Sequence, residues 1–223
     1  MKKRSRRGLV MLSGGQDSAT CLAIAGIKCY EVHTVSFDYG QRHLIELDMA
    51  ERLANIAKVK RHHTVPINSF GFIDDSALLT SEVLSGSHRG NQNLPASFVP
   101  GRNLVFVTLA AALLYKIKGD VLYGGMNQTD YSGYPDCRKP ALTYIHNACQ
   151  LGMDYSFELR LPLLNKTKVE TVNWMLDLGK FNWYKHTHTC YNGERPPCME
   201  CPACIIRQKG FDEAGVKDPL LDA

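Results

Sequence analysis

The sequence predicts an α/β protein built on a doubly wound parallel sheet of five strands. Short apolar or alternating segments, typical of strands, occur at residues 9–12, 31–37, 61–66, 120–123 and 157–161. Segments of helical periodicity follow these strands, which favours parallel strands joined by right-handed crossovers. In such sheets ligands bind beyond the carboxyl ends of the strands, near the point where the strand order reverses.

Composition narrows the class of protein. The 223 residues suffice for one sizeable domain, and 44% hydrophobic with 22% charged residues is typical of a globular protein. The apolar run after the basic arm at residues 2–7 stops at Leu12, too short for a signal peptide, and no segment reaches membrane-spanning length. We therefore expect a cytoplasmic protein without a membrane partner. The arm explains much of the net charge of +4 and is interpreted as a solvated tail, so no stable nucleic-acid partner is expected.

The segment Ser13-Gly14-Gly15-Gln16-Asp17-Ser18 lies between the first strand and the first helix. Glycines allow close backbone approach to an anion, and the helix N-terminus presents unpaired N–H groups. An ordinary glycine-rich turn is the alternative, but two serines and an aspartate favour phosphate binding. Asp17 could cap the helix or hold a metal ion. The predicted ATP-binding residues here are Leu12, Ser13, Gly14, Gly15, Gln16, Asp17, Ser18, Ala19, Thr20, Cys21 and Leu22.

This loop lacks the Gly-Lys-Ser/Thr ending of kinase-type phosphate loops. A loop without that lysine suits a pyrophosphate leaving group better than a transferred terminal phosphoryl group. The pattern Ser-Gly-Gly-x-Asp-Ser resembles the signature of the N-type ATP pyrophosphatases. That resemblance implies activation of a carbonyl oxygen as its adenylate, with release of pyrophosphate.

Basic residues near other strand ends are further candidates. Arg42 either contacts phosphates or, with His43, merely begins the next helix. Arg102 follows a Pro-Gly turn and could clamp phosphates or a substrate carboxylate. Lys166 could stabilise charge on ATP or be an ordinary surface lysine. The helix expected after Arg102, at residues 104–117, is apolar almost all round and is predicted to be buried core.

Two further segments bear on the substrate. Residues 81–101 are polar and rich in glycine and serine, typical of a lid or a disordered loop, and end near Phe98, which could stack on a base or pack against the next helix. Residues 130–138 combine carboxylates, tyrosines and an arginine, which suits a planar heterocycle with N–H donors and a carboxylate. A structural turn in which Asp136 caps the helix at 139–151 is the alternative. The predicted substrate-binding residues are Phe98, Asp130, Tyr131, Tyr134, Asp136 and Arg138.

Four cysteines near the C-terminus follow the pattern C-x7-C-x2-C-x2-C: Cys190, Cys198, Cys201 and Cys204. In a reducing compartment this spacing predicts a tetrahedral metal site, with zinc favoured and an iron–sulfur cluster as the competitor. Four thiolates leave no open position, so the metal would be structural. We therefore divide the chain into an ATP-using domain, residues 1–185, and a small zinc-binding segment, residues 186–223.

Taken together, Leu12–Ser18, the stretch Phe37-Asp38-Tyr39-Gly40-Gln41-Arg42-His43, Phe98–Asn103, Asp130–Arg138 and the cysteine cluster resemble the ExsB family of 7-cyano-7-deazaguanine synthases. The resemblance spans nearly the whole chain. It implies an adenine nucleotide alpha hydrolase-like fold of the HUP type, and conversion of 7-carboxy-7-deazaguanine and ammonia to the nitrile with ATP, Mg²⁺ and structural zinc. It also suggests a homodimer. Ser13, Asp17, Ser18 and Lys166 would act by positioning and electrostatic stabilisation.

Two alternatives remain at this point. A tRNA-thiolating enzyme shares the phosphate-loop chemistry but needs a persulfide cysteine near the loop and an RNA-binding domain, for which the length leaves no room. A zinc-dependent RNA-binding module using the basic arm belongs to a different class. ATP turnover that depends on the small deazaguanine acid distinguishes the synthase from both.

Overall fold

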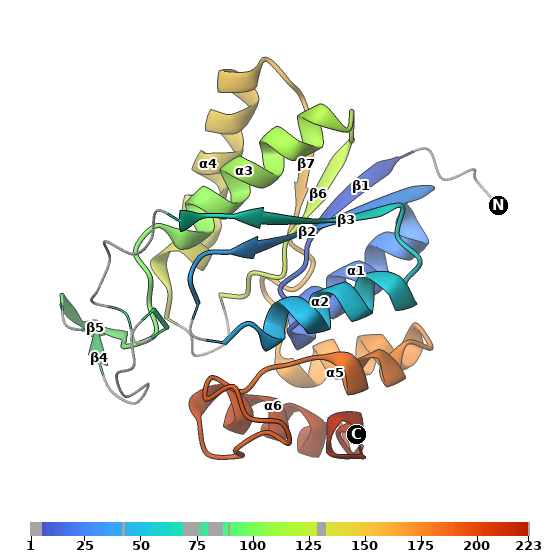
Figure 1. Ribbon diagram of the computed structural model, residues 1–223, viewed down its shortest axis with the longest axis vertical. Coiled ribbons are helices and arrows are strands. Elements are labelled where there is room, and N and C mark those ends of the chain that lie inside the picture. Colours follow the sequence, from blue (N-terminus) through green and yellow to red (C-terminus); the bar gives the residue numbers. More distant parts are fainter. Residues whose placement is uncertain are drawn as a thin grey trace.

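A parallel sheet of five strands in the order β3-β2-β1-β6-β7 forms the centre of the molecule (Figure 1). The computed structural model describes residues 6–222 except 42, 69–75, 77, 80–86, 89 and 129–132. The strands of the sheet are β1 (Arg7–Met11), β2 (Glu31–Asp38), β3 (Arg61–Pro66), β6 (Val121–Tyr123) and β7 (Glu158–Arg160). All four strand pairs are parallel, so the predicted fold class is confirmed.

The strand order reverses at β1. The chain adds β2 and β3 on one side of β1, then returns to place β6 and β7 on the other. Leu9 and Val10 of β1 are fully buried because helices cover both faces of the sheet. The carboxyl ends of β1 and β6 therefore border the crevice in which this fold class binds ligands, and residues 13–18 follow β1 directly.

Two helical layers enclose the sheet (Figure 1). One layer contains α1 (Gln16–Lys28), α2 (Ile45–Ile56) and α5 (Lys168–Asp177), and the other contains α3 (Arg102–Lys116) and α4 (Lys139–Met153). Separate apolar clusters fill the two sides of the sheet. The last helix, α6 (Pro202–Glu213), packs against α5 outside these layers (Figure 1). No helix among the described residues is long and apolar enough to cross a membrane.

Helix α3 corrects one sequence-based prediction. It was expected to be buried almost all round, but only one of its faces is. Val107, Ala110 and Leu114 are fully buried against the sheet, whereas the outward Val105 and Tyr115 are 37% and 54% exposed. An outer helix of a three-layer protein meets the sheet along one stripe only. The apolar composition of α3 therefore did not mean that the helix is buried on all sides.

The polar segment before α3 contains regular structure. Within residues 81–101, β4 (Ser87–His88) and β5 (Asn91–Pro95) form a separate antiparallel two-stranded sheet. The sequence indicated a loop here because these strands lack apolar alternation. Residues 81–86 and 89 lie outside the described part of the chain.

The C-terminal segment is ordered around a buried arginine. Arg207 of α6 is 2% exposed and forms an ion pair with Asp218, which is 3% exposed. Its guanidinium also donates hydrogen bonds to the hydroxyl oxygens of Thr187, at 2.7 Å, and Thr189, at 2.8 Å. A buried guanidinium is tolerated only when its charge is paired and its donors are satisfied. These contacts tie residues 187–189 to α6.

Candidate active site and metal centre

The predicted phosphate loop, residues 13–18, is closed by hydrogen bonds that involve the hydroxyls of its two serines. Ser18 Oγ donates to the carbonyl of Gly15 at 3.0 Å and lies 3.2 Å from Ser13 Oγ, while the N–H of Gly15 donates to Ser13 Oγ at 3.3 Å. Gly15 precedes α1 and no side chain caps this helix. The N-terminus of α1 therefore presents uncapped N–H groups at the carboxyl end of β1, as an anion site requires.

Close backbone packing explains both the glycine at position 14 and the shape of the loop. Gly14 has φ +82°, and a Cβ there would lie 2.2 Å from the carbonyl oxygen of Glu46. Its own carbonyl accepts a hydrogen bond from the N–H of His188 at 2.8 Å. Gly125, after β6, also packs closely against the loop, because a Cβ on it would lie 3.1 Å from the N of Ser18. The loop is thus held between α2, β6 and the C-terminal segment.

Asp17 does not cap α1. Its carboxylate contacts a lysine of α5 instead. Lys168 Nζ, at the start of α5, lies 2.8 Å from Asp17 Oδ1 and 2.6 Å from Asp17 Oδ2. The two side chains are 16% and 25% exposed. Lys166, the lysine predicted from the sequence to stabilise charge on ATP, pairs with Glu170 on the surface at 2.7 Å.

Most of the residues predicted to bind ATP in this loop and in the first turns of α1 are buried, and only a few are exposed. Gln16 is buried, and Leu12, Ala19, Thr20, Cys21 and Leu22 are at most 1% exposed, so their side chains serve the packing of β1 and α1. Thr20 Oγ1, for example, lies 2.8 Å from the buried Tyr184 hydroxyl. Only Ser13, Gly15 and Asp17 of the loop keep appreciable exposure. These three residues border the open side of the loop.

Arg102 lies among aromatic rings at the start of α3. Its guanidinium carbon is 5.7 Å from the ring centroids of both Tyr39 and Tyr134, and it donates a hydrogen bond to the Tyr39 hydroxyl at 3.4 Å. Burial opposes its charge, but these tyrosines and Asp136 together raise the pKa of Arg102, so it is a permanent cation. Burial also raises the pKa of the neighbouring Glu46 to about 7, although Arg102 acts to lower it. Arg102 therefore interacts with the carboxyl group of a residue whose backbone packs against Gly14.

Phe98 and Tyr134 form one wall of this region. Their ring centroids are 5.7 Å apart, and the Tyr134 hydroxyl lies 2.6 Å from Ser97 Oγ. Both rings are at least 92% buried. Phe98 therefore packs against Tyr134. This contact is neither stacking on a base nor packing against the next helix, the two roles expected for it.

Asp136 caps a helix, but not the one considered from the sequence. Its carboxylate accepts hydrogen bonds from the backbone N of Asn103 at 2.9 Å and from Asn103 Nδ2 at 3.0 Å, at the N-terminus of α3. Both carboxylate oxygens are used by these contacts. Arg138, the residue before α4, is exposed. Arg42, Asp130 and Tyr131 lie outside the described residues.

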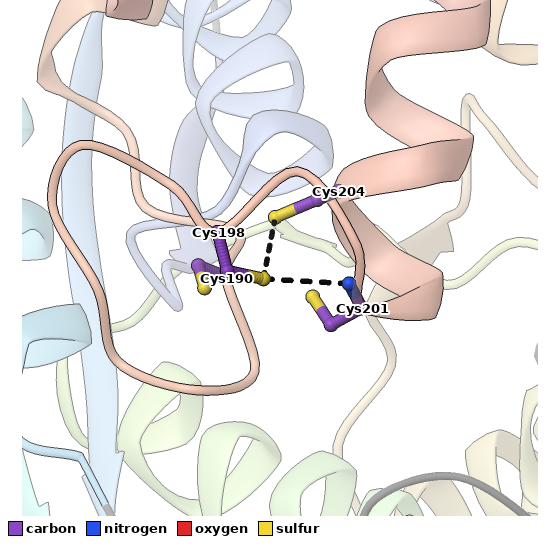
Figure 2. A group of neighbouring side chains, drawn as sticks. All are labelled: Cys190, Cys198, Cys201 and Cys204. Carbon is purple, nitrogen blue, oxygen red and sulfur yellow. Dashed lines mark hydrogen bonds between the residues drawn. The ribbon is translucent and has the colours of Figure 1, made fainter.

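The four C-terminal cysteines come together as predicted (Figure 2). All four sulfur atoms lie within 4.8 Å of one another, and the Sγ atoms of Cys198 and Cys204 are 3.9 Å apart. Sulfurs bound tetrahedrally to zinc at about 2.3 Å are separated by about 3.8 Å. The cluster is therefore positioned to bind a metal, and its geometry and donor set are consistent with zinc.

The remaining cysteines near the phosphate loop are poorly suited to nucleophilic chemistry. Cys21 is fully buried, and burial, helped by Asp17, raises the pKa of its thiol. Burial and Asp136 likewise raise the pKa of Cys137 to about 12. A thiol that stays protonated is a weak nucleophile.

Sequence reasoning missed Lys168, Glu46 and Tyr39. A signal for Lys168 was present, because Thr167 and Glu170 form a capping box, which places the start of the helix at Lys168. Glu46 and Tyr39 had no comparable signal, since only the folded chain brings them to Arg102.

The sequence of this chain is similar to those of known proteins. The sequence matches the family described as "Queuosine biosynthesis protein QueC" over residues 7–215. The 7-cyano-7-deazaguanine synthase of Chromobacterium violaceum is 48% identical, covering 97% of this chain and 93% of that protein. The enzyme of the same name from Laribacter hongkongensis is 45% identical, covering 96% and 93%.

Among solved structures, a 4-thiouridine synthetase–RNA complex with bound ATP superimposes with a TM-score of 0.53. It is 13% identical and covers 94% of this chain and 50% of that one, so the likeness concerns the fold alone. The family match covers almost the whole chain, from β1 to the end of α6. The chain therefore belongs to the QueC family of queuosine biosynthesis proteins.

Proposed function

We propose that this chain is a 7-cyano-7-deazaguanine synthase that works in the cytoplasm, in queuosine biosynthesis. It would use ATP to convert 7-carboxy-7-deazaguanine and ammonia to the nitrile. The observation that carries this proposal is the family match over residues 7–215, together with relatives of that name at up to 48% identity. An uncapped α1 N-terminus at the reversal of strand order supports it.

The chemistry requires two activations of the same carbon. The substrate carboxylate first attacks the α-phosphorus of ATP, releasing pyrophosphate and giving an acyl adenylate. Ammonia then displaces AMP and leaves the amide. The amide oxygen then attacks the α-phosphorus of a second ATP, which releases a second pyrophosphate and gives an imidoyl adenylate. Loss of AMP, with both protons of the amide nitrogen released over these steps, leaves the nitrile. No protein nucleophile is needed, so catalysis rests on positioning and electrostatic stabilisation.

The described residues supply what these steps need. The α1 N–H groups, with the hydroxyls of Ser13 and Ser18, would bind the departing pyrophosphate. Mg²⁺ bound with ATP would neutralise phosphate charge, and the Asp17 carboxylate is a suitable hard oxygen ligand beside the loop. Arg102, a buried cation, would attract the substrate carboxylate or the phosphates.

The thiolation alternative is disfavoured by a specific observation. It would need a reactive cysteine near the loop, and Cys21 and Cys137 are both buried with raised pKa values. Within the part of the chain that the structure describes, the other clustered cysteines belong to the candidate metal site.

Pyrophosphate release is the direct test. With ATP and Mg²⁺ we expect release only when 7-carboxy-7-deazaguanine is added, and formation of the nitrile only when ammonia is also present. Mass spectrometry of the products checks the second step. Release triggered by tRNA, and not by the small acid, would contradict the synthase proposal.

We also propose that the protein is a homodimer through the outward faces of α3 and α4. Tyr115 on α3 is 54% exposed, and Tyr144 and Leu151, one stripe of α4, are 76% and 85% exposed. Large apolar side chains gathered on one face favour association. Light scattering after gel filtration should give a dimer mass for the wild type and a monomer mass for Leu151→Glu. A monomeric wild type would refute this interface.

A further inference from the structure

We propose that Lys168 is a positioning residue for the phosphate loop: it neutralises and orients Asp17, so that a polyphosphate can approach the N-terminus of α1. The inference rests on the proposed use of ATP and assigns a role to a residue outside the loop. It begins from the ammonium of Lys168, which contacts both carboxylate oxygens of Asp17, at 2.8 and 2.6 Å.

The lysine is held in place by two elements. Thr167 caps α5 and forms a reciprocal capping box with Glu170, which fixes Lys168 as the first residue of the helix. On the other side, a Cβ added at Gly210 of α6 would lie 2.6 Å from the Lys168 Cβ. The absence of a side chain at Gly210 lets α6 press against the base of this lysine. The ammonium is therefore directed toward the loop by packed structure.

A charge argument explains why the site needs this lysine. The N-terminus of α1 attracts anions through its uncapped N–H groups. A carboxylate in that first turn would repel ATP, whose phosphates carry several negative charges. Asp17 is only 25% exposed, so water screens its charge incompletely. Lys168 cancels that charge at the atoms that carry it.

The neighbouring lysine does not share this arrangement. Lys166 is two residues away, 41% exposed, and pairs with Glu170 on the surface. Its ammonium makes an exposed ion pair with a residue four positions along the chain, and the contribution of such a pair to stability is small. The contact with Asp17, and not the local density of lysines, singles out Lys168.

Calorimetric titration of the full chain with ATP in EDTA isolates the effect from metal binding. We expect Lys168→Met to weaken ATP binding about 10- to 100-fold, because the Asp17 charge is left uncompensated. Lys168→Arg should keep most of the affinity. The double variant Asp17→Asn with Lys168→Met should recover affinity to within about threefold of wild type, because both charges are gone. Lys209→Met is the matched control, since that lysine pairs with Glu213 on the exposed side of α6.

The possible results of this titration distinguish a failure of this inference from a failure of the proposed function. A wild type that binds ATP neither in EDTA nor in the presence of Mg²⁺ would refute the proposed function itself. If the wild type binds and Lys168→Met binds equally well, Lys168 has no role in the loop. If the double variant binds as weakly as Lys168→Met, the ammonium contacts the phosphates itself and the positioning role is wrong. Circular dichroism spectra matching the wild type confirm that each variant is folded.

Discussion

Asp17→Ala is expected to abolish pyrophosphate release from ATP in the presence of Mg²⁺ and 7-carboxy-7-deazaguanine, while the protein stays folded. Asp17 does not cap α1, and its carboxylate is partly exposed beside Lys168. Removing it leaves the Lys168 ammonium without this partner, which should lower the melting temperature without unfolding the chain. It also removes the carboxylate proposed to meet Mg²⁺ at the phosphates. We expect turnover to fall by at least about 10³-fold, as for the loss of a strong electrostatic contact at the reacting phosphates.

Thermal unfolding measured alongside turnover separates loss of chemistry from loss of fold. Asp177→Ala, at the exposed C-terminal end of α5, is a suitable control carboxylate because it lies outside the phosphate loop. Turnover of Asp17→Ala within tenfold of wild type would show that Asp17 is dispensable to the phosphate site.

Cys204→Ser is expected to remove the bound metal and to destabilise the C-terminal segment. Cys204 is 2% exposed and lies in the first turn of α6, with its sulfur 3.9 Å from that of Cys198. Structural zinc contributes about 10 kcal/mol or more to the folding of small zinc domains, so loss of one thiolate should be severe. Elemental analysis should find about one zinc per chain in the wild type and far less in the variant. The melting temperature should fall with it.

Cys149→Ser provides the control for this experiment. This buried thiol lies on α4, in the apolar cluster on the opposite side of the sheet. The substitution should leave the metal content unchanged even if stability decreases slightly. Equal metal content in Cys204→Ser and the wild type would mean that the cluster does not hold the metal. Iron in place of zinc would favour the iron–sulfur alternative.

The parts of the fold that sequence predicted well are those determined locally. Alternating and apolar segments marked all five strands of the central sheet, and Arg61–Pro66 was predicted to the residue. The glycine turn that leads from β1 into α1 and the cysteine cluster were also recognisable, because each depends on residue types at short, fixed spacing. A pattern within a few neighbouring residues predicts only the structure of those residues.

What sequence did not reveal depends on contacts between distant segments. Lys168 reaches Asp17 only because α5 packs beside α1. Asp136 was considered as a cap for the helix that follows it, yet it caps α3, which precedes it. Helix α6 lies in the segment for which the sequence predicted a zinc site but no helix, since its composition gives little sign of a buried face. Arg207 organises that segment through partners on both sides of it in the chain.

The bond from the N–H of His188 to the carbonyl of Gly14 joins nearly opposite ends of the polypeptide. During translation, Gly14 emerges from the ribosome long before His188 is made. A nascent chain that has completed all five strands of the central sheet would still lack the hydrogen bond from His188 to its phosphate loop. Competence to bind nucleotide should therefore arise late in biosynthesis, and premature termination before His188 should yield a sheet that cannot hold its ligand properly.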